Sequence, residues 1–221
     1  GVISPLLANI FFHHAFDEWM RVNHPSIPIV RYADDIIVHC RTEAQAQVML
    51  RVIERRLARC KLQLHPEKTK IVYCKDARRP GNYKHESFDF LGYCFRPRDC
   101  KGDNYFIGFT PAVSKSAIKA MSATIRSWKL PLWSSSSLGD IARRINPVVR
   151  GWLNYYGRYY KSAMRPILRQ LQFALVRWAM RKYKRLRNYW LNATHWLGRI
   201  ARREPRLFSS GEFGFRPSAG Q

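Results

Sequence analysis

Apolar residues recur at helical spacing near the start of the chain and predict two helices. Ser4 and Pro5 are typical of a helix start, since Ser is a common N-cap and Pro is favoured at the first helical position. The apolar positions from Leu6 to Met20 then indicate a helix of about four turns. Residues Thr42–Gln45 match capping-box spacing, and the amphipathic stretch that follows to Cys60 predicts the second helix.

Between and after these helices the pattern changes to short runs of β-branched and aromatic residues. Within residues 29–39 such runs flank Ala33-Asp34-Asp35 and predict two short strands joined by a tight turn. Further strands are predicted at 70–74 and 88–95, with 105–109 as a hairpin partner. This order of elements indicates an α+β fold, in which a split βαβ-like sheet carries its helices on one face.

Beyond residue 110 the pattern is helical throughout. Ser114 is the expected N-cap of one helix, and residues 138–145 are expected to form another. Asn146-Pro147 is then predicted to begin a separate helix. A regular apolar stripe from Met164 to Trp178 predicts one more helix, so this part of the chain is expected to be all-α.

Charge divides the chain at the same place. Of the 221 residues 46% are apolar and 14% aromatic, which is typical of a folded globular protein. Residues 1–110 carry 17 Lys and Arg against 12 Asp and Glu, whereas residues 111–221 carry 22 against 3. We therefore predict two domains with these bounds, and we expect the basic one to bind a polyanion, either nucleic acid or an anionic membrane surface.

Cysteine usage and the chain start bear on the compartment. The five cysteines are odd in number and include no C-x-x-C pair, which argues against a disulfide framework and a structural zinc site. No apolar run approaches the roughly 20 residues of a membrane span. The opening GVISPLL has neither an initiator Met nor a charged signal-peptide start. We expect a cytoplasmic protein, of a bacterial or organellar interior, cut from a longer chain.

Two acidic residues, Asp34 and Asp35, interrupt an apolar run. Two like charges this close repel each other, and a divalent cation relieves that repulsion. Mg²⁺ needs only one or two protein carboxylates, and a pair of Mg²⁺ ions suits phosphoryl or nucleotidyl transfer. The alternative is that Asp serves here as an ordinary turn former without chemical function.

With these residues in view, the chain resembles a group II intron reverse transcriptase/maturase. The sequence YADD at residues 32–35 resembles the Y-x-D-D catalytic hairpin of that family. Its neighbours resemble the flanking family segments in the same order, namely GVISPLLANIFFHHAFDEW before it, then LQLHPEKTKIV and the primer-gripping FDFLGYCF. Three later segments resemble the maturase-specific thumb of the family, namely INPVVRGWLNYY, RWAMRKYKR and IARREPRLF.

The resemblance implies a palm over residues 1–110 and a helical thumb over residues 111–221. It implies that Asp34 and Asp35 are the catalytic residues and ligands of a two-Mg²⁺ site. It further implies positions near the nucleotide and template–primer for Tyr32, Ala33, Ser4, Pro5 and Lys68, and a primer grip formed by Phe90, Leu91 and Gly92. Lys68 is either a proton donor to the leaving pyrophosphate or a solvated lysine.

The sequence departs from the family pattern in one respect. The family uses a third metal-binding Asp and a fingers region, both upstream of the motif with which this sequence opens. The acidic residues Asp17 and Glu18 are interpreted as surface charges on the first helix. We therefore expect that this chain alone does not polymerise.

The resemblance also implies the partners, namely group II intron RNA, an RNA template with a DNA primer, and dNTPs, but no membrane. RNA contacts are expected from eleven basic residues: Arg143, Arg144, Arg150, Arg158, Arg181, Lys182, Lys184, Arg185, Arg187, Arg202 and Arg203. Among the interleaved aromatic residues, Trp152 and Tyr156 are expected in the core, while Tyr159 and Tyr160 remain open between packing and stacking on bases.

Two other functions fit parts of the pattern. A splicing cofactor that binds intron RNA without polymerase activity would need the basic helices but not Asp34 and Asp35. A nucleotidyl cyclase-like palm also uses hairpin carboxylates, but the basic helical region disfavours it. The sequence leaves open whether the protein forms dimers.

Overall fold

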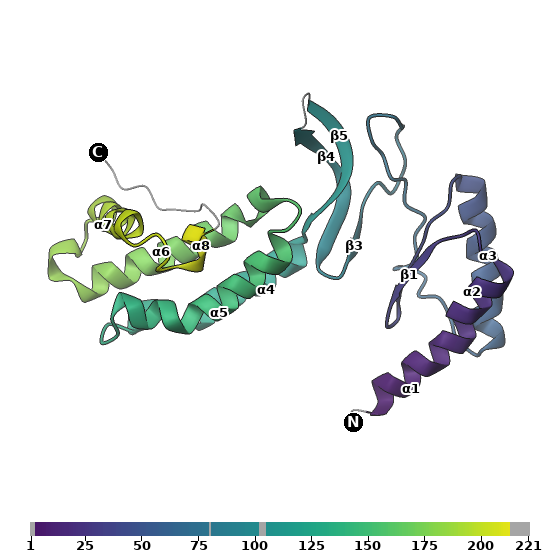
Figure 1. Ribbon diagram of the computed structural model, residues 1–221, viewed down its shortest axis with the longest axis horizontal. Coiled ribbons are helices and arrows are strands. Elements are labelled where there is room, and N and C mark those ends of the chain that lie inside the picture. Colours follow the sequence, from purple (N-terminus) through teal and green to yellow (C-terminus); the bar gives the residue numbers. More distant parts are fainter. Residues whose placement is uncertain (1–2, 80, 102–104, 213–221) are drawn as a thin grey trace. The chain divides into compact units, whose positions relative to one another are not determined.

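The computed structural model describes residues 3–79, 81–101 and 105–212, and the chain forms two compact units. The first comprises Gly1–Tyr73 with Gly81–Glu86, and the second comprises Cys74–Pro80 with Ser87–Gln221. The fold is mixed, with helices and small antiparallel sheets, as the sequence predicts at this level (Figure 1).

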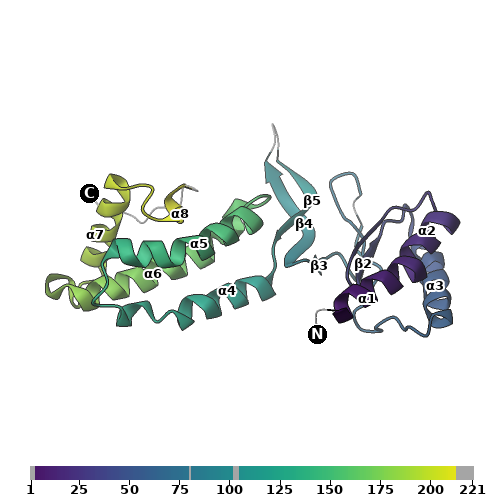
Figure 2. The ribbon, with the colours of Figure 1, turned by 60° about the horizontal axis from the view of Figure 1, so that its bottom comes forward.

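The first unit packs its helices against a β-hairpin (Figure 2). Its elements are α1 (Ile3–Phe12), the π-helical turn η1 (His13–Asp17), α2 (Glu18–Asn23), β1 (Ile29–Tyr32), β2 (Asp35–Val38) and α3 (Glu43–Arg59). The first three run on without a break and form the predicted N-terminal helix, but α1 already includes Ile3, so Ser4 is not its N-cap as predicted. Thr42 Oγ1 accepts a 3.1 Å hydrogen bond from the Gln45 amide, which confirms the predicted N-cap of α3.

The core of the first unit lies where these helices meet. Phe16 and Met20 are buried against Met49, Ile53 and Leu57 of α3. The inner faces of β1 and β2 are half-buried on the same cluster. The hairpin is therefore anchored along its strands, and its turn remains exposed.

The second unit joins a three-stranded antiparallel sheet to a helical layer. Its strands are β3 (Phe88–Phe90), β4 (Tyr93–Lys101) and β5 (Tyr105–Val113). Its helices are α4 (Lys115–Ser127), η2 (Leu130–Leu132), α5 (Leu138–Tyr156), η3 (Lys161–Met164), α6 (Arg165–Lys182), η4 (Lys184–Leu186), α7 (Trp190–Arg203) and α8 (Ser209–Glu212). One apolar cluster connects α4 to α7, with the fully buried Trp178 donating a 2.8 Å hydrogen bond to the Trp133 carbonyl.

Several predicted elements of the second unit are confirmed. Ser114 caps α4 by accepting a 3.1 Å hydrogen bond from the Ala117 amide. The apolar stripe that begins at Met164 is the buried face of α6. The strand at 105–109 pairs with β4 as the predicted hairpin partner.

One helix boundary was predicted wrongly. Residues 138–156 form a single helix, α5, which passes through Pro147. Proline removes one helical hydrogen bond, but Ile145 and Val149 on either side are both buried in the common core. Asn146 lies inside α5 and is not the N-cap of a separate helix; its amide donates to the Leu207 carbonyl at 2.9 Å and its Oδ1 accepts from the amide of Ser209, the first residue of α8, at 3.0 Å.

The predicted strand at 70–74 is also wrong. The segment has no strand structure, and a single 2.9 Å hydrogen bond links the Tyr73 amide to the His85 carbonyl. A strand needs a continuous hydrogen-bonding partner, and this segment has none among the described residues. The described strands accordingly pair in two separate antiparallel sheets and not in one split sheet.

The two compact units differ from the predicted domains. The sheet of β3, β4 and β5 groups with the helices because β5 runs directly into the Ser114 cap, and Tyr93 packs on aromatic residues of α5. The functional boundary near residue 110 stays a prediction. No helix in the described part of the chain is long and apolar enough to cross a membrane.

Candidate catalytic hairpin and nucleic-acid interface

The turn between β1 and β2 presents two carboxylates to solvent. Tyr32 lies opposite Asp35 in the antiparallel register, so Ala33 and Asp34 form the turn, as predicted. Ala33 has a positive φ of 54°, a region that disfavours residues other than glycine. Asp34 and Asp35 are exposed, as is the Tyr32 ring. The backbone of this turn therefore needs support from outside it.

Arg31 provides that support. Its Nη1 donates to the Ala33 carbonyl at 2.8 Å, directly beneath the turn, and to Asn9 Oδ1 at 3.0 Å. Its Nε and Nη2 bind the carboxylate of Asp17 at 2.8 and 2.7 Å. One planar guanidinium thus connects the turn to α1 and η1, a geometry that lysine cannot reproduce.

The interpretation of Asp17 as a surface charge was wrong. The Asp17 side chain is 26% exposed and that of Arg31 only 13%. The hydrogen bonds from Arg31 hold the pKa of Asp17 below its ordinary value, against the opposing effect of burial. Glu18 is more exposed and pairs with Arg21 at 2.8 Å, as expected of a surface charge.

The hairpin carboxylates suit a hard cation chemically. Neither Asp34 nor Asp35 has a hydrogen bond or ion pair within the described residues, so their oxygens are available. Two carboxylates are the protein share of a Mg²⁺ site that is completed by water and phosphate. In the described ranges, no three His, Cys, Asp or Glu side chains gather as a metal-binding cluster.

The other residues predicted to lie near the nucleotide are exposed. Ser4 and Pro5 lie within the first turn of α1, and the Pro5 carbonyl accepts a 3.1 Å hydrogen bond from Asn9. Through Asn9 this end of α1 is connected to Arg31 and hence to the hairpin. Lys68 lies in a turn after α3, and no contact links it to Asp34 or Asp35 in the described structure.

The predicted primer grip forms a second hairpin turn, in the second unit. Phe90 lies opposite Tyr93, so Leu91 and Gly92 form the turn, with φ values of 50° and 76°. Positive φ at both positions defines the type I′ class that joins two-stranded hairpins. A Cβ atom at Gly92 would lie 2.7 Å from Tyr156 Oη, so the position requires glycine on two counts.

Aromatic residues of α5 support this second turn. Tyr155 Oη donates to the Leu91 carbonyl at 2.9 Å, and the Tyr93 hydroxyl donates to the Tyr155 carbonyl. Burial raises the pKa of both Tyr93 and Tyr156, so their hydroxyls stay protonated. Tyr155 was not predicted to have a structural role, and its place next to Tyr156 on α5 was the available signal.

The predicted packing of other aromatic residues is resolved in part. Trp152 stacks on Trp128 with ring centroids 5.8 Å apart, and Tyr156 is half-buried beside Tyr93. Tyr160 lies under the Arg98 guanidinium, at 5.6 Å from the ring centroid. Tyr159 is 59% exposed and remains the aromatic residue of this group most accessible to a base.

The basic residues predicted to contact RNA are exposed, with one exception. They lie on α5 and just after it, and at the ends of α6, η4 and α7: Arg143, Arg144, Arg150, Arg158, Arg181, Lys184, Arg185, Arg187, Arg202 and Arg203. Lys182 instead donates to the carbonyls of Ser134 and Ser136 at 2.9 and 2.7 Å. Its ammonium therefore fixes a loop of its own chain, and cations near helix C-termini also stabilise the helix dipole.

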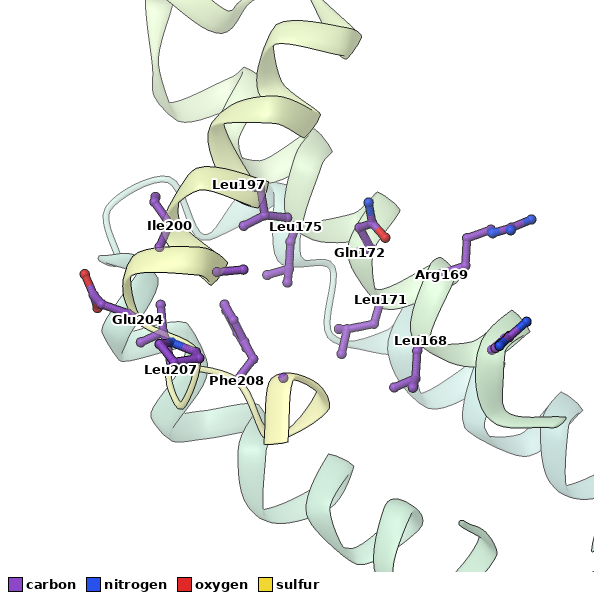
Figure 3. A pocket seen from close by; sticks show the side chains of 14 residues that line it. Leu168, Arg169, Leu171, Gln172, Leu175, Leu197, Ile200, Glu204, Leu207 and Phe208 are labelled. Atoms are coloured by element: carbon purple, nitrogen blue, oxygen red, sulfur yellow. The ribbon is translucent and has the colours of Figure 1, made fainter. Parts of the chain in front are cut away.

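A cavity of about 310 Å³ opens between α6, α7 and the segment that follows α7. Its lining is largely aliphatic and aromatic, with Leu171 and Leu175 from α6, Leu197 and Ile200 from α7, and Phe208 (Figure 3). Arg165, Arg169, Gln172 and Glu204 add polar groups to this lining.

Comparison with protein families matches the chain in two segments. Residues 1–95, which include the Asp34-Asp35 hairpin, match the model for reverse transcriptase (RNA-dependent DNA polymerase). Residues 118–196, from α4 to α7, match the group II intron maturase-specific domain. No curated protein matches the chain.

The match over residues 1–95 supports membership of the reverse transcriptase class. The second match narrows the class, because the maturase-specific domain belongs to proteins encoded by group II introns. The two matches together identify the chain as a group II intron reverse transcriptase/maturase, and they fit an intron-encoded protein that assists splicing.

Proposed function

We propose that this chain contributes the metal-binding hairpin and the nucleic-acid-holding helices of an RNA-directed DNA polymerase. The hairpin belongs to the C-terminal part of its palm, residues 1–110, and the helices to its thumb, residues 111–221. The observation that carries the proposal is the exposed pair Asp34 and Asp35 on a turn fixed from beneath by Arg31. Both carboxylates are exposed and unpaired within the described residues, and the turn that carries them is held by the Arg31 guanidinium, so their oxygens suit the ligation of a cation.

In this proposal Asp34 and Asp35 would hold Mg²⁺, whose chemistry is to stabilise charge on phosphate oxygens and activate the attacking hydroxyl. The chain's own contribution is position. Arg31 fixes the carbonyl of the turn, and the exposed Tyr32 ring offers an apolar surface to the primer–template. Ala33 is small enough for a nucleotide sugar to approach closely.

Further residues of the chain bind nucleic acid in this proposal. Ser4 and Pro5 lie on the same helix as Asn9, which accepts a hydrogen bond from Arg31. We therefore place them close to the nucleotide and the template. Phe90, Leu91 and Gly92 hold the primer backbone, and Gly92 leaves the turn without a side chain there. The basic helices hold the RNA template, the DNA primer and intron RNA. The protein works in the cytoplasm or an organellar interior, on dNTPs.

We further propose that the 221-residue chain alone does not polymerise. Asp17, an acidic residue of η1 beside the hairpin, is occupied by Arg31 and cannot serve as a third metal ligand. The test is primer extension on an RNA template with Mg²⁺ and dNTPs. We expect no extension by the chain. Extension that is lost in the Asp34→Ala variant would show that the two hairpin carboxylates suffice.

An RNA-binding splicing cofactor without polymerase activity is the second candidate. It is favoured by the charge of residues 111–221, which carry 22 basic against 3 acidic residues. RNA binding by the full chain, measured over a salt series, should weaken steeply as salt rises. Splicing assistance that survives Asp34→Ala together with Asp35→Ala would support this role, and its loss would support the polymerase hairpin as part of the RNA-binding surface.

A further inference from the structure

A second cavity, of about 280 Å³, lies between η4 and α7. Four of its lining residues are on α7, with spacings of three and four positions that place them on one face of the helix. The complete lining is Arg185, Leu186, Asn192, His195, Trp196 and Arg199. We call this site the η4–α7 pocket.

The polar groups of the η4–α7 pocket are mostly hydrogen-bond donors. Two guanidinium groups, an imidazole and an amide line it, and no acidic residue does. The side chains of Arg185, Asn192, His195 and Arg199 make no hydrogen bond or ion pair within the described residues. Elsewhere in this unit arginines do find acidic partners, as Arg203 does with Glu204 at 3.3 Å.

The floor of the pocket is rigid. The half-buried Trp196 packs on the Tyr183 ring, with centroids 5.1 Å apart, and also contacts the buried Trp178. Leu186 is buried, and its amide donates to the Tyr183 carbonyl at 2.9 Å. Arg185 and Arg199 therefore extend from backbone that is fixed by the core, which reduces the entropy lost when a ligand is bound.

We propose that the η4–α7 pocket binds a backbone phosphate of RNA. Guanidinium groups match the paired oxygens of a phosphate, and the imidazole and amide supply further donors. The amide oxygen of Asn192 is in addition an acceptor for a ribose 2′-hydroxyl, a group that DNA lacks. The volume is close to the lower end of ligand pockets, about 300 Å³, and admits a phosphate with part of its nucleoside. The proposal rests on the proposed RNA-binding function.

The test compares two double variants of the full chain that lose the same charge. The pocket variant carries Arg185→Gln and Arg199→Gln. The control carries Arg126→Gln and Arg177→Gln, whose side chains are exposed and have no partner in the described structure. Binding of a labelled single-stranded RNA is measured by fluorescence anisotropy over a series of KCl concentrations, and circular dichroism verifies that both variants fold.

We expect the pocket variant to lose roughly tenfold more affinity for the RNA than the control. The slope of its log affinity against log salt concentration should decrease by the amount that corresponds to about one phosphate contact. Equal losses in both variants would overturn the pocket and leave RNA binding intact as a function. Absence of RNA binding by the unmodified chain would overturn the pocket and the proposed RNA-binding function together.

A second measurement separates RNA from small anions. The imidazole signals of His195, assigned by comparison with the His195→Gln variant, are followed by NMR during titration with the RNA and with inorganic phosphate. The proposal expects RNA to shift these signals and to displace phosphate. If inorganic phosphate saturates the pocket and RNA fails to displace it, the site binds free anions and the proposal is wrong.

Discussion

The two hairpin turns of this protein share the conformation of their first turn residue and differ in how they are held. In each, the first turn residue has positive φ without being glycine: Ala33 at 54° and Leu91 at 50°. In each, one side chain donates to the carbonyl of that residue. The donor is Arg31 in the first unit, at 2.8 Å, and Tyr155 in the second, at 2.9 Å.

The difference lies in what surrounds the donor. Arg31 is fixed by the charge of Asp17, and the turn above it carries two further carboxylates. Tyr155 is fixed by packing against Tyr93 and Tyr156, around a turn with no charge. A turn proposed to present carboxylates to a cation is thus held by an ion pair, and a turn proposed to approach a primer backbone is held by aromatic packing.

The largest effect on stability is expected at Gly92 of the second turn, where a side chain cannot be accommodated. Gly92→Ala places a Cβ at positive φ and 2.7 Å from Tyr156 Oη. The backbone strain and the overpacking together should lower the free energy of unfolding by about 3 kcal/mol. The free energy of unfolding is measured by urea denaturation with tryptophan fluorescence as the signal, because six of the seven tryptophans lie in the second unit.

A matched substitution in the same unit should have the opposite sign. Gly151 lies inside α5, and a Cβ there meets nothing within 4 Å. Gly151→Ala should raise the free energy of unfolding by about 0.5–1 kcal/mol, since alanine favours the helix. If both alanine variants destabilise the protein equally, close packing at Gly92 is not the cause.

The ion-pair support of the first turn should show the next largest effect. Arg31→Met removes the five hydrogen bonds that the guanidinium donates and leaves Asp17 half-buried without its partner, at a cost of about 2 kcal/mol. Arg31→Lys should retain only part of the stability that Arg31→Met loses, because lysine lacks the planar guanidinium with its several donors. Hydrogen exchange at the amides of residues 29–38 reports the change.

The control for Arg31 is an exposed ion pair in the same unit. Arg21 and Glu18 are joined at 2.8 Å on the surface, where such pairs contribute little. Arg21→Met should leave exchange in residues 29–38 unchanged. Faster exchange in this variant as well would mean that charge removal from the unit, and not loss of the turn support, is responsible.

The two supports should also respond differently to pH. The pKa of Asp17 is lowered from its ordinary value of 3.8 in the folded state, so its contribution is fully present well above that value and is lost as the pH falls through the lowered pKa. Unfolding free energies of the unmodified chain and of Arg31→Met should therefore converge in acid. A constant difference between them down to about pH 2 would contradict the ion-pair account.

The sequence predicts elements well where local pattern decides them. The N-caps at Thr42 and Ser114 and the hairpin at YADD depend on a few neighbouring residues, and all three are confirmed. Pro147 was misinterpreted because burial of the residues around it outweighs the helix-breaking tendency of proline. The segment 70–74 has strand composition, but only the fold decides whether a partner strand lies beside it.

The same distinction applies to the candidate site. The carboxylates of Asp34 and Asp35 were evident from their neighbours, whereas the role of Arg31 depends on Asp17, 14 positions away. Similarly Tyr155 acts on Leu91 across 64 positions. An arginine within an otherwise apolar strand is the one signal that pointed to a buried partner.

The smallest effect is expected when only the hydroxyl group of Tyr155 is removed from the aromatic support of the second turn. Tyr155→Phe keeps the ring against Tyr93 and removes only the hydrogen bond to the Leu91 carbonyl. We expect a loss of about 1 kcal/mol in urea unfolding. Tyr159→Phe is the control, since the Tyr159 hydroxyl has no hydrogen-bond partner among the described residues and should not change stability. If Tyr155→Phe also leaves the free energy of unfolding unchanged, ring packing alone supports the second turn. The hydrogen bond from Tyr155 would then not have the stabilising role that we assign to the hydrogen bond from Arg31.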